Sequence, residues 1–283
     1  MAALDPDTAQ TRHTRMAVLD VRDETAFAAG HMPGAGHLPH AELEARRTEL
    51  PPRETAVLVV AASGAEAAAA AADLMGLGYP QVDWLDAPLA VVPSGLESRA
   101  PAVRLWRPAP FLEQVLPRLE SAHEKGGPGL ALDLACGAGR EAVFLAMHGF
   151  EVEAVDDDPR ILERARALAE RCGVRITTRV CDLERGDPGL PQARYRLVIV
   201  FRFLHRPLLP EIAKAIAPGG WLVYETFRRG QRRFGRPSHP RFLLDDGELS
   251  SAFPGLSVEH YEEPSPAGGP ITARLLARKP PLP

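Results

Sequence analysis

The chain has 283 residues, which is long enough for two domains that each bury a core. Hydrophobic residues make up 45% and charged residues 25%, a composition typical of soluble globular proteins that excludes wholesale disorder and a small disulfide-dependent module. The net charge of -4 is uneven, because residues 1–100 hold 7 arginines and 14 acidic residues while residues 101–283 carry a basic excess. The two halves are therefore expected to meet different partners.

The cysteines and the hydropathy pattern predict a cytoplasmic protein. Cys136, Cys172 and Cys181 lack the spacing of a zinc site or a disulfide framework, and a reducing compartment fits them best. The N-terminus has no apolar core of a signal sequence, and no run of 18 apolar residues predicts a membrane span. Metal binding is not expected, and neither is contact with a membrane.

The first half of the chain alternates short apolar runs with helical segments. Residues 1–15 are polar and aperiodic, so a flexible start is expected. The predicted elements that follow are strands at residues 17–21, 56–60 and up to Leu85, and helices at residues 23–30, 41–50 and 65–75. This order predicts a small α/β domain with a parallel sheet over residues 16–95, followed by a Pro- and Gly-rich linker over residues 96–110.

The second half alternates more regularly. The predicted strands are residues 129–135, 151–156, 174–183, 195–201, 221–227, 256–263 and 271–279, and the predicted helices are residues 111–120, 140–149, 159–173 and 209–220. Pro117 is expected to kink the first helix or to start a second one. Five βα units and a final strand pair predict a doubly wound seven-stranded sheet with an antiparallel edge over residues 111–283.

A glycine turn, in the run LDLACGAGR, carries the richest candidate site. Gly137 and Gly139 let the backbone turn sharply and approach a ligand closely. Asp133, just before the turn, would repel the pyrophosphate of a dinucleotide but can accept from an ammonium group. Asp156 ends the next strand, where it can accept from two ribose hydroxyls, and Asp182 ends the third, where it can accept from an adenine amino group. Because strands of a parallel sheet end at one edge, the three acids predict S-adenosylmethionine as the cofactor.

These motifs resemble those of the class I S-adenosylmethionine-dependent methyltransferases. The run LDLACGAGREAVFLAMHGFEVEAVDDDP is similar to the tellurite-resistance-type small-molecule enzymes of that family, and the resemblance covers about residues 105–283. It implies the class I methyltransferase fold and the following cofactor contacts: Asp133, Gly137 and Gly139 at the methionine moiety, Asp156 at the ribose, and Asp182 with Leu183 at the adenine.

The methyl acceptor is expected beyond the fourth and fifth strands. In-line methyl transfer mainly needs alignment of donor and acceptor and exclusion of water. His205 and Arg202 are the candidate catalytic residues. The candidate substrate-binding residues are Arg206, Tyr224, Arg228, Arg229, Arg232 and Arg233. Each of these roles has a competing interpretation. The arginines could form a solvated loop in an arginine-biased chain, Tyr224 could pack in the core, and His205 could be structural.

The first domain resembles a single rhodanese-like domain. The resemblance rests on LDVRDETAFAAGHMPGAGHLPHAEL and on the Ser63-Gly64 turn that leads into a helix. Sulfur transfer in that family needs a cysteine at the start of this turn, because a thiolate must form the persulfide. This chain has Ala61 there and no cysteine before Cys136. We therefore expect an inactive module whose loop binds an anion or a protein partner.

Together these features predict methyl transfer from S-adenosylmethionine to a small acceptor that is anionic or of the thiol type, beside a non-catalytic rhodanese-like module. Two alternatives stay open. In the first, the acceptor is RNA or a thiolated nucleotide and the arginine-rich segment grips its phosphates, although nucleic acid is not the favoured partner. In the second, the protein is not an enzyme and senses S-adenosylmethionine or binds a partner.

Overall fold

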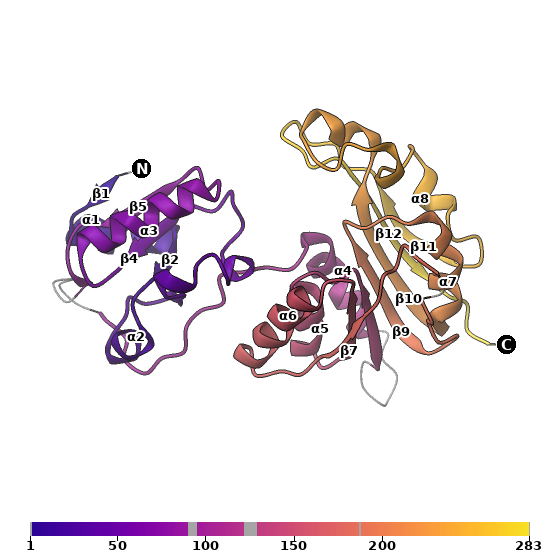
Figure 1. Cartoon of the computed structure of the whole chain (residues 1–283), viewed down its shortest axis with the longest axis horizontal. Coiled ribbons are helices and arrows are strands. Elements are labelled where there is room, and N and C mark those ends of the chain that lie inside the picture. Colours follow the sequence, from indigo (N-terminus) through magenta and orange to yellow (C-terminus); the bar gives the residue numbers. More distant parts are fainter. Residues whose placement is uncertain (1, 90–94, 122–128, 187, 283) are drawn as a thin grey trace. The chain divides into compact units, whose positions relative to one another are not determined.

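The computed structural model describes residues 2–89, 95–121, 129–186 and 188–282 (Figure 1). The chain divides into two compact units, Met1–Arg107 and Pro108–Pro283. The first holds a five-stranded sheet and the second a seven-stranded sheet, which confirms the predicted α/β class. Within the described ranges, no helix combines the length and the apolar character needed to cross a bilayer.

The first unit is built on a parallel sheet with strand order β1-β5-β4-β2-β3. Its strands are β1 Ala3–Leu4, β2 Ala17–Asp20, β3 Gly36–His37, β4 Val57–Val60 and β5 Val82–Leu85. Its α-helices are α1 Pro6–Arg12, α2 Glu24–Ala29 and α3 Gly64–Gly76.

The central strand β4 explains why this sheet is covered on both faces. Successive side chains of a strand point to opposite faces, and all four residues of β4 are buried. Val57 and Val59 belong to the core formed with α3, whereas Leu58 and Val60 belong to the core that contains Phe27 of α2. A run of four apolar β-formers therefore supplies both cores.

Both ends of this unit carry more structure than the sequence suggested. Residues 1–15 were expected to be flexible, but β1 pairs with β5, and Asp5 caps α1 by accepting from the N–H of Thr8 at 2.9 Å. Residues 96–110 were expected to be a linker, but Glu97 forms a β-bridge with His31, and the Val103 N–H donates to the Ala35 carbonyl at 2.9 Å. The division between the units therefore falls at residue 107.

The helix expected at residues 41–50 is also absent from the structure. Two short 3-10 helices, His40–Glu42 and Arg47–Glu49, occupy this segment instead. Pro51 and Pro52 follow directly and cannot continue a helix, and Arg46 bonds to carboxylates on both sides, Glu42 and Glu49. Local ion pairs and turns therefore replace helical bonding.

The second unit has strand order β11-β12-β10-β9-β6-β7-β8, with β12 antiparallel to both neighbours, as predicted for the edge. Its strands are β6 Leu130–Leu134, β7 Glu151–Asp156, β8 Thr177–Val180, β9 Tyr195–Phe201, β10 Ile216–Phe227, β11 Ser257–Glu262 and β12 Thr272–Arg278. Its α-helices are α4 Pro110–Ser121, α5 Arg140–Met147, α6 Pro159–Arg171, α7 Leu209–Ala215 and α8 Glu248–Ser251.

Helices cover both faces of this sheet. Figure 1 shows α4, α5 and α6 on one face and α7 and α8 on the other. Alternate strand residues such as Leu134, Val200 and Tyr224 pack in the core with Ile212 of α7 and Leu249 of α8. The neighbouring positions Asp133, Ile199 and Val223 pair across β6, β9 and β10 and therefore face α4–α6.

Two helices of this unit differ from their predicted form. α4 is a single helix that includes Pro117, with one buried face of apolar residues. The helix expected over residues 209–220 ends at Ala215, and β10 begins at Ile216. Pro218 cannot donate to a helix interior, and the Gly219 N–H donates to the Lys279 carbonyl next to the end of β12. Strand pairing therefore takes over where the helix was expected to continue.

Candidate functional site

The site lies where the strand order of the second unit reverses. From β6 the chain runs outward through β7 to β8 and then returns to form β9 on the other side of β6. In open α/β sheets, ligands bind at such a switch point, outside the carboxyl ends of the strands. Every predicted cofactor-binding residue lies in or near the segments that leave these carboxyl ends.

The glycine turn after β6 uses backbone conformations that most residues avoid. Ala135, Gly137 and Gly139 have φ values of 56°, 54° and 79°. A Cβ on Gly139 would lie 2.6 Å from the Cβ of Ala165 on α6, so this glycine allows α5 and α6 to pack closely. A Cβ on Gly137 would meet nothing within 4 Å, so this glycine borders open space. The two glycines therefore have different tasks, one in packing and one at the site.

Asp156, the last residue of β7, is oriented by the turns around it. Its Oδ2 accepts from the Gly137 N–H at 2.9 Å, and its Oδ1 accepts from the Asp158 N–H at 3.2 Å. Asp158 in turn caps α6 by accepting from the Arg160 N–H. The carboxylate is half-buried, so its remaining acceptor capacity is available to a ligand.

Asp133 is the most unusual group in the site. It is 2% exposed, and its Oδ2 has no hydrogen-bond partner in the described part of the chain. Burial, with the negative charges of Glu141 and Asp156, raises the pKa of this carboxyl well above its ordinary value. A buried acceptor with no partner is costly, and here a cationic donor would relieve both the desolvation and the repulsion.

A cavity of about 430 Å³ opens beside these acids. The following residues line it: Ala135, Asp156, Asp157, Cys181, Asp182, Leu183, Glu184, Arg185 and Phe203. The structure thus brings Asp156, Asp182 and Leu183 together at one cavity, while Asp133, Gly137 and Gly139 do not line it. Asp157 was missed, although it directly follows a predicted site residue; burial and the neighbouring Asp156 raise the pKa of its carboxyl.

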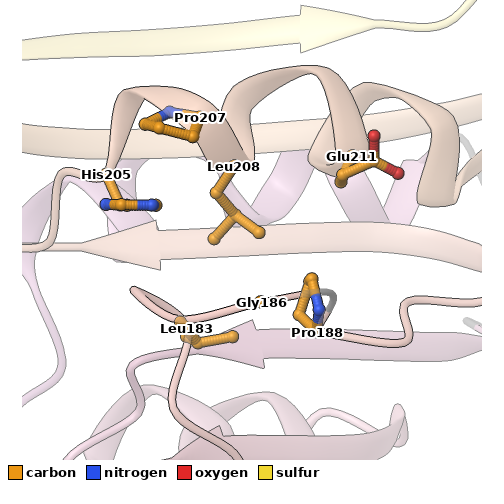
Figure 2. A pocket seen from close by; sticks show the side chains of 7 residues that line it. All are labelled: Leu183, Gly186, Pro188, His205, Pro207, Leu208 and Glu211. Atoms are coloured by element: carbon orange, nitrogen blue, oxygen red, sulfur yellow. The ribbon is translucent and has the colours of Figure 1, made fainter.

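Two further cavities continue along the same edge. One of about 360 Å³ is lined by Leu183 and His205, and one of about 330 Å³ by Glu184 and His205. In Figure 2, His205 and Leu208 face the loop that carries Leu183 and Pro188 across the first of these cavities. His205 therefore borders both, and each shares a residue with the 430 Å³ cavity.

Arg202, the other candidate catalytic residue, directly follows β9. Its φ is 58°, and its N–H donates to the Glu225 carbonyl at 2.8 Å. Its side chain is exposed and has no acidic partner within the described ranges. A non-glycine residue held in the left-handed region is a form of backbone strain that clusters at functional sites.

Four of the six predicted substrate-binding residues bond to other residues of the protein: Arg206, Arg228, Tyr224 and Arg229. The Arg206 guanidinium bonds to Glu248 at 2.6 and 2.8 Å and to the carbonyls of Arg241 and Leu243. Arg228 is 8% exposed and donates to the Thr272 carbonyl, to Ser265 and to Asp246. These contacts fix the loop after β10 and engage both guanidinium groups within the protein; a ligand contact by either arginine stays a prediction.

The remaining predicted substrate-binding residues are Tyr224, Arg229, Arg232 and Arg233. Tyr224 is fully buried, its hydroxyl donates to the Phe203 carbonyl at 3.1 Å, and burial raises its pKa. Arg229 pairs with Asp245, whereas Arg232 and Arg233 are exposed and have no acidic partner in the part of the chain that the structure covers. Tyr224 is therefore a core residue, which favours the competing interpretation, and its contact with the acceptor stays a prediction.

In the first unit, residues of the run that resembles a rhodanese-like domain bond to one another and hold its loops together. Asp20 is fully buried and bonds to Arg22, which also donates to the Gly30 carbonyl at 2.6 Å. Ala61 lies in a cavity of about 650 Å³ whose charged lining includes Asp23, Glu66 and Asp73.

Three histidines in the resembling run of this unit have separate partners. His31, His37 and His40 bond to the Phe27 carbonyl, the Arg22 carbonyl and Asp73. Among the residues with described positions, no group of histidine, cysteine and acidic side chains could hold a metal ion.

A switch-point sheet, a glycine turn and acids at the strand ends define an α/β domain suited to a nucleoside-containing cofactor. Comparison with known families assigns both units. Residues 131–220 match the methyltransferase domain family, and residues 5–87 match the rhodanese-like domain family. The chain therefore joins a rhodanese-like domain to a methyltransferase domain.

Three curated proteins illustrate the similarity. The uncharacterized protein UNK4.09 of Schizosaccharomyces pombe is 22% identical over 286 residues, or 82% of this chain and 83% of that protein. The ribosomal protein L11 methyltransferase of Dechloromonas aromatica is 36% identical over 35% of this chain and 33% of its own. The probable S-adenosyl-L-methionine-dependent methyltransferase TehB of Haemophilus influenzae is 29% identical over 31% of this chain and 30% of its own. The chain thus spans about a third of the two named enzymes.

Proposed function

We propose that this protein transfers a methyl group from S-adenosylmethionine to a small acceptor that is anionic or of the thiol type. A methyltransferase domain implies S-adenosylmethionine as the cofactor, and the TehB relative carries that dependence in its name. The observation that carries the proposal is the buried Oδ2 of Asp133, which has no hydrogen-bond partner among the described residues. Asp133 lies two residues before Ala135, which lines the same cavity as Asp156 and Asp182.

The donor set fits this cofactor. S-adenosylmethionine carries an ammonium group, a sulfonium, two ribose hydroxyls and an adenine amino group, all of which are cations or hydrogen-bond donors. Asp133 would accept from the ammonium, Asp156 from the ribose hydroxyls and Asp182 from the adenine amino group, while Leu183 packs against the ring. The open space beside Gly137 leaves room for the amino-acid part. The same carboxylates would repel the pyrophosphate of a dinucleotide.

The bound cofactor supplies an electrophilic methyl carbon on a positively charged sulfur. The protein's part is to hold the acceptor in line with that carbon and to exclude water. His205 lines both neighbouring cavities, which supports a contact between it and the acceptor. Arg202 is exposed and has no acidic partner within the described positions, which supports a role in holding an anionic group.

The charge distribution favours a small acceptor over RNA. In the arginine-rich segment after β10, Arg228, Arg229 and Arg241 each pair with an acid. Arg232 and Arg233 alone among the predicted substrate-binding arginines have a free guanidinium in the described structure. A phosphate chain is recognised by many cations at once, so this segment offers fewer contacts than its sequence suggests.

The rhodanese-like domain is proposed to be a non-catalytic module. Ala61 occupies the position at which the resemblance requires a thiolate, and residues 1–135 hold no cysteine. The acidic residues of its cavity lining, Asp23, Glu66 and Asp73, would also disfavour an anionic sulfur donor, and Arg22 in the same lining is already bonded to Asp20. A protein partner is the proposed ligand of this domain.

The experiment that tests the proposed function measures S-adenosylhomocysteine by mass spectrometry. The full chain is incubated with S-adenosylmethionine and a panel of thiols and small anions. The wild type and Glu170→Gln, a change at an exposed residue of α6, are expected to form product with at least one acceptor. Asp133→Asn is expected to form at least tenfold less. Absence of product from the folded wild type with every acceptor would overturn the proposal.

A further inference from the structure

A second buried carboxylate lies on the same side of the sheet and has no place in the proposed cofactor contacts. Glu225, near the end of β10, is 7% exposed, and its Oε2 has no hydrogen-bond partner within the described ranges. Leaving such an acceptor unpaired costs stability. A donor from a bound ligand would satisfy this oxygen.

The other oxygen of Glu225 is firmly held. Its Oε1 accepts from the Arg274 Nε at 3.0 Å and from the Thr272 hydroxyl at 3.1 Å, both on β12. Arg274 also donates to Glu262 at 2.9 Å and lies over the ring of Phe111 on α4. The donors thus converge on one oxygen and fix the carboxylate with the other oxygen free.

Strand register places the Glu225 side chain on the same face of the sheet as Asp133. Asp133 pairs with Ile199, which pairs with Val223, and Glu225 follows Val223 by two residues. Asp133 and Glu225 therefore share the face that α4–α6 cover, on strands that flank β9. Two strand spacings and two residues put their Cα atoms about 12 Å apart.

Glu225 also borders the segment proposed for the acceptor. Its carbonyl accepts from the Arg202 N–H at 2.8 Å, and Phe201 is its partner on β9. Asp133, assigned to the ammonium, and Glu225 thus lie on either side of the strand end from which the acceptor segment leaves.

Resting on the proposed function, we infer that Glu225 takes the proton of a thiol acceptor. A free carboxylate oxygen attracts an S–H donor and repels an anion, so it selects the thiol from the two acceptor types. The acceptor sulfur bonds to the methyl carbon with its lone pair, while the bond from that carbon to the cofactor sulfur breaks and leaves its electron pair there. The thiol proton passes to Glu225 Oε2 and then to water, so charge and atoms balance without another reactant.

The test compares Glu225→Gln with Glu262→Gln, which alters the other carboxylate held by Arg274. The two acceptors are 2-mercaptoethanol, which is mostly protonated at pH 8, and benzenethiol, which is mostly ionised there. Calorimetry with S-adenosylmethionine is expected to give an affinity within about twofold of wild type for both variants. Turnover of Glu225→Gln should fall about 100-fold with 2-mercaptoethanol. With benzenethiol, which arrives as an anion and has no proton to give to Glu225, turnover should stay the same or rise. Glu262→Gln should keep both rates within about threefold.

The inference is overturned if Glu225→Gln keeps its rate with 2-mercaptoethanol, if both thiols lose rate equally, or if a wild type that binds S-adenosylmethionine methylates neither thiol. A wild type that does not bind S-adenosylmethionine refutes the proposed function itself, and the inference with it. Glu225→Asp keeps the charge next to Arg274 and serves if Glu225→Gln does not fold. Its shorter side chain should lower the 2-mercaptoethanol rate while leaving the benzenethiol rate nearly unchanged.

Discussion

The backbone N–H of Gly137 donates to the Oδ2 of Asp156 at 2.9 Å, which ties the glycine turn after β6 to the end of β7. This bond orients the carboxylate proposed to hold the ribose while the turn keeps open space beside Gly137. Gly137 and Asp156 therefore contribute both to the stability of this region and to the proposed ligand site.

Replacement by alanine should lower the free energy of unfolding more at Gly139 than at a glycine with similar backbone geometry. Gly139→Ala strains a φ of 79° and drives its Cβ to 2.6 Å from Ala165, so we expect a loss of about 2–4 kcal/mol in the free energy of unfolding. Gly173, at a φ of 68° with no atom within 4 Å, is the matched control and should lose about 1 kcal/mol. Urea unfolding measures both; equal losses would show that the contact with α6 is unimportant.

Asp133 should destabilise the ligand-free protein in a pH-dependent way. The unfolded chain ionises this carboxyl near 3.8, whereas burial and the charges of Glu141 and Asp156 keep the folded form protonated to higher pH. The penalty is therefore absent below about pH 3.8, grows as pH rises toward the folded pKa and is complete above it.

Asp133→Asn removes that penalty. We expect the variant to exceed wild type in the free energy of unfolding by more than about 1 kcal/mol at pH 7 and by much less at pH 3.5. Urea unfolding at a series of pH values, without ligand, gives the difference directly. A difference that does not change with pH would contradict the raised pKa.

Arg228 should matter for stability and Arg232 should not. Arg228→Ala leaves the Thr272 carbonyl and Ser265 without their buried donor, so a loss of about 3 kcal/mol is expected. Arg232 is exposed, and its replacement by alanine should change the free energy of unfolding by less than about 0.5 kcal/mol. If the two variants unfold alike, the stabilising role of Arg228 is wrong.

The rhodanese-like domain should not transfer sulfur. With thiosulfate and cyanide, the wild type is expected to form no thiocyanate above the uncatalysed rate, because Ala61 cannot form a persulfide. Ala61→Cys should also remain slow, because Asp23, Glu66 and Asp73 around the cavity disfavour a thiolate. Rapid thiocyanate formation by the wild type would contradict the non-catalytic assignment.

The strand alternation made the acidic residues of the site predictable. Asp156 ends its strand, and Asp182 follows shortly after the next one, so the parallel topology alone placed them at one cavity. The sheet of the second unit was predictable for the same reason, since each strand was bounded by a helix or a turn.

The roles of the arginines could not be read in this way. Arg206 binds Glu248, and Arg228 binds the Thr272 carbonyl, partners 42 and 44 residues away in the sequence. Glu225 was missed because the donors that fix it come from β12, which the local pattern does not connect to β10. The arginine-rich composition therefore suggested a cationic surface, whereas Arg206 and Arg228 bond to other parts of the same unit.

Calorimetric titration with S-adenosylmethionine and with NAD, on the wild type, Asp156→Asn and the exposed-site control Glu170→Gln, tests the central claim most directly. We expect the wild type and Glu170→Gln to bind S-adenosylmethionine equally and to ignore NAD, and Asp156→Asn to bind about tenfold to a hundredfold more weakly. A wild type that does not bind S-adenosylmethionine, or an Asp156→Asn variant that binds it as tightly as wild type, would contradict the assigned site.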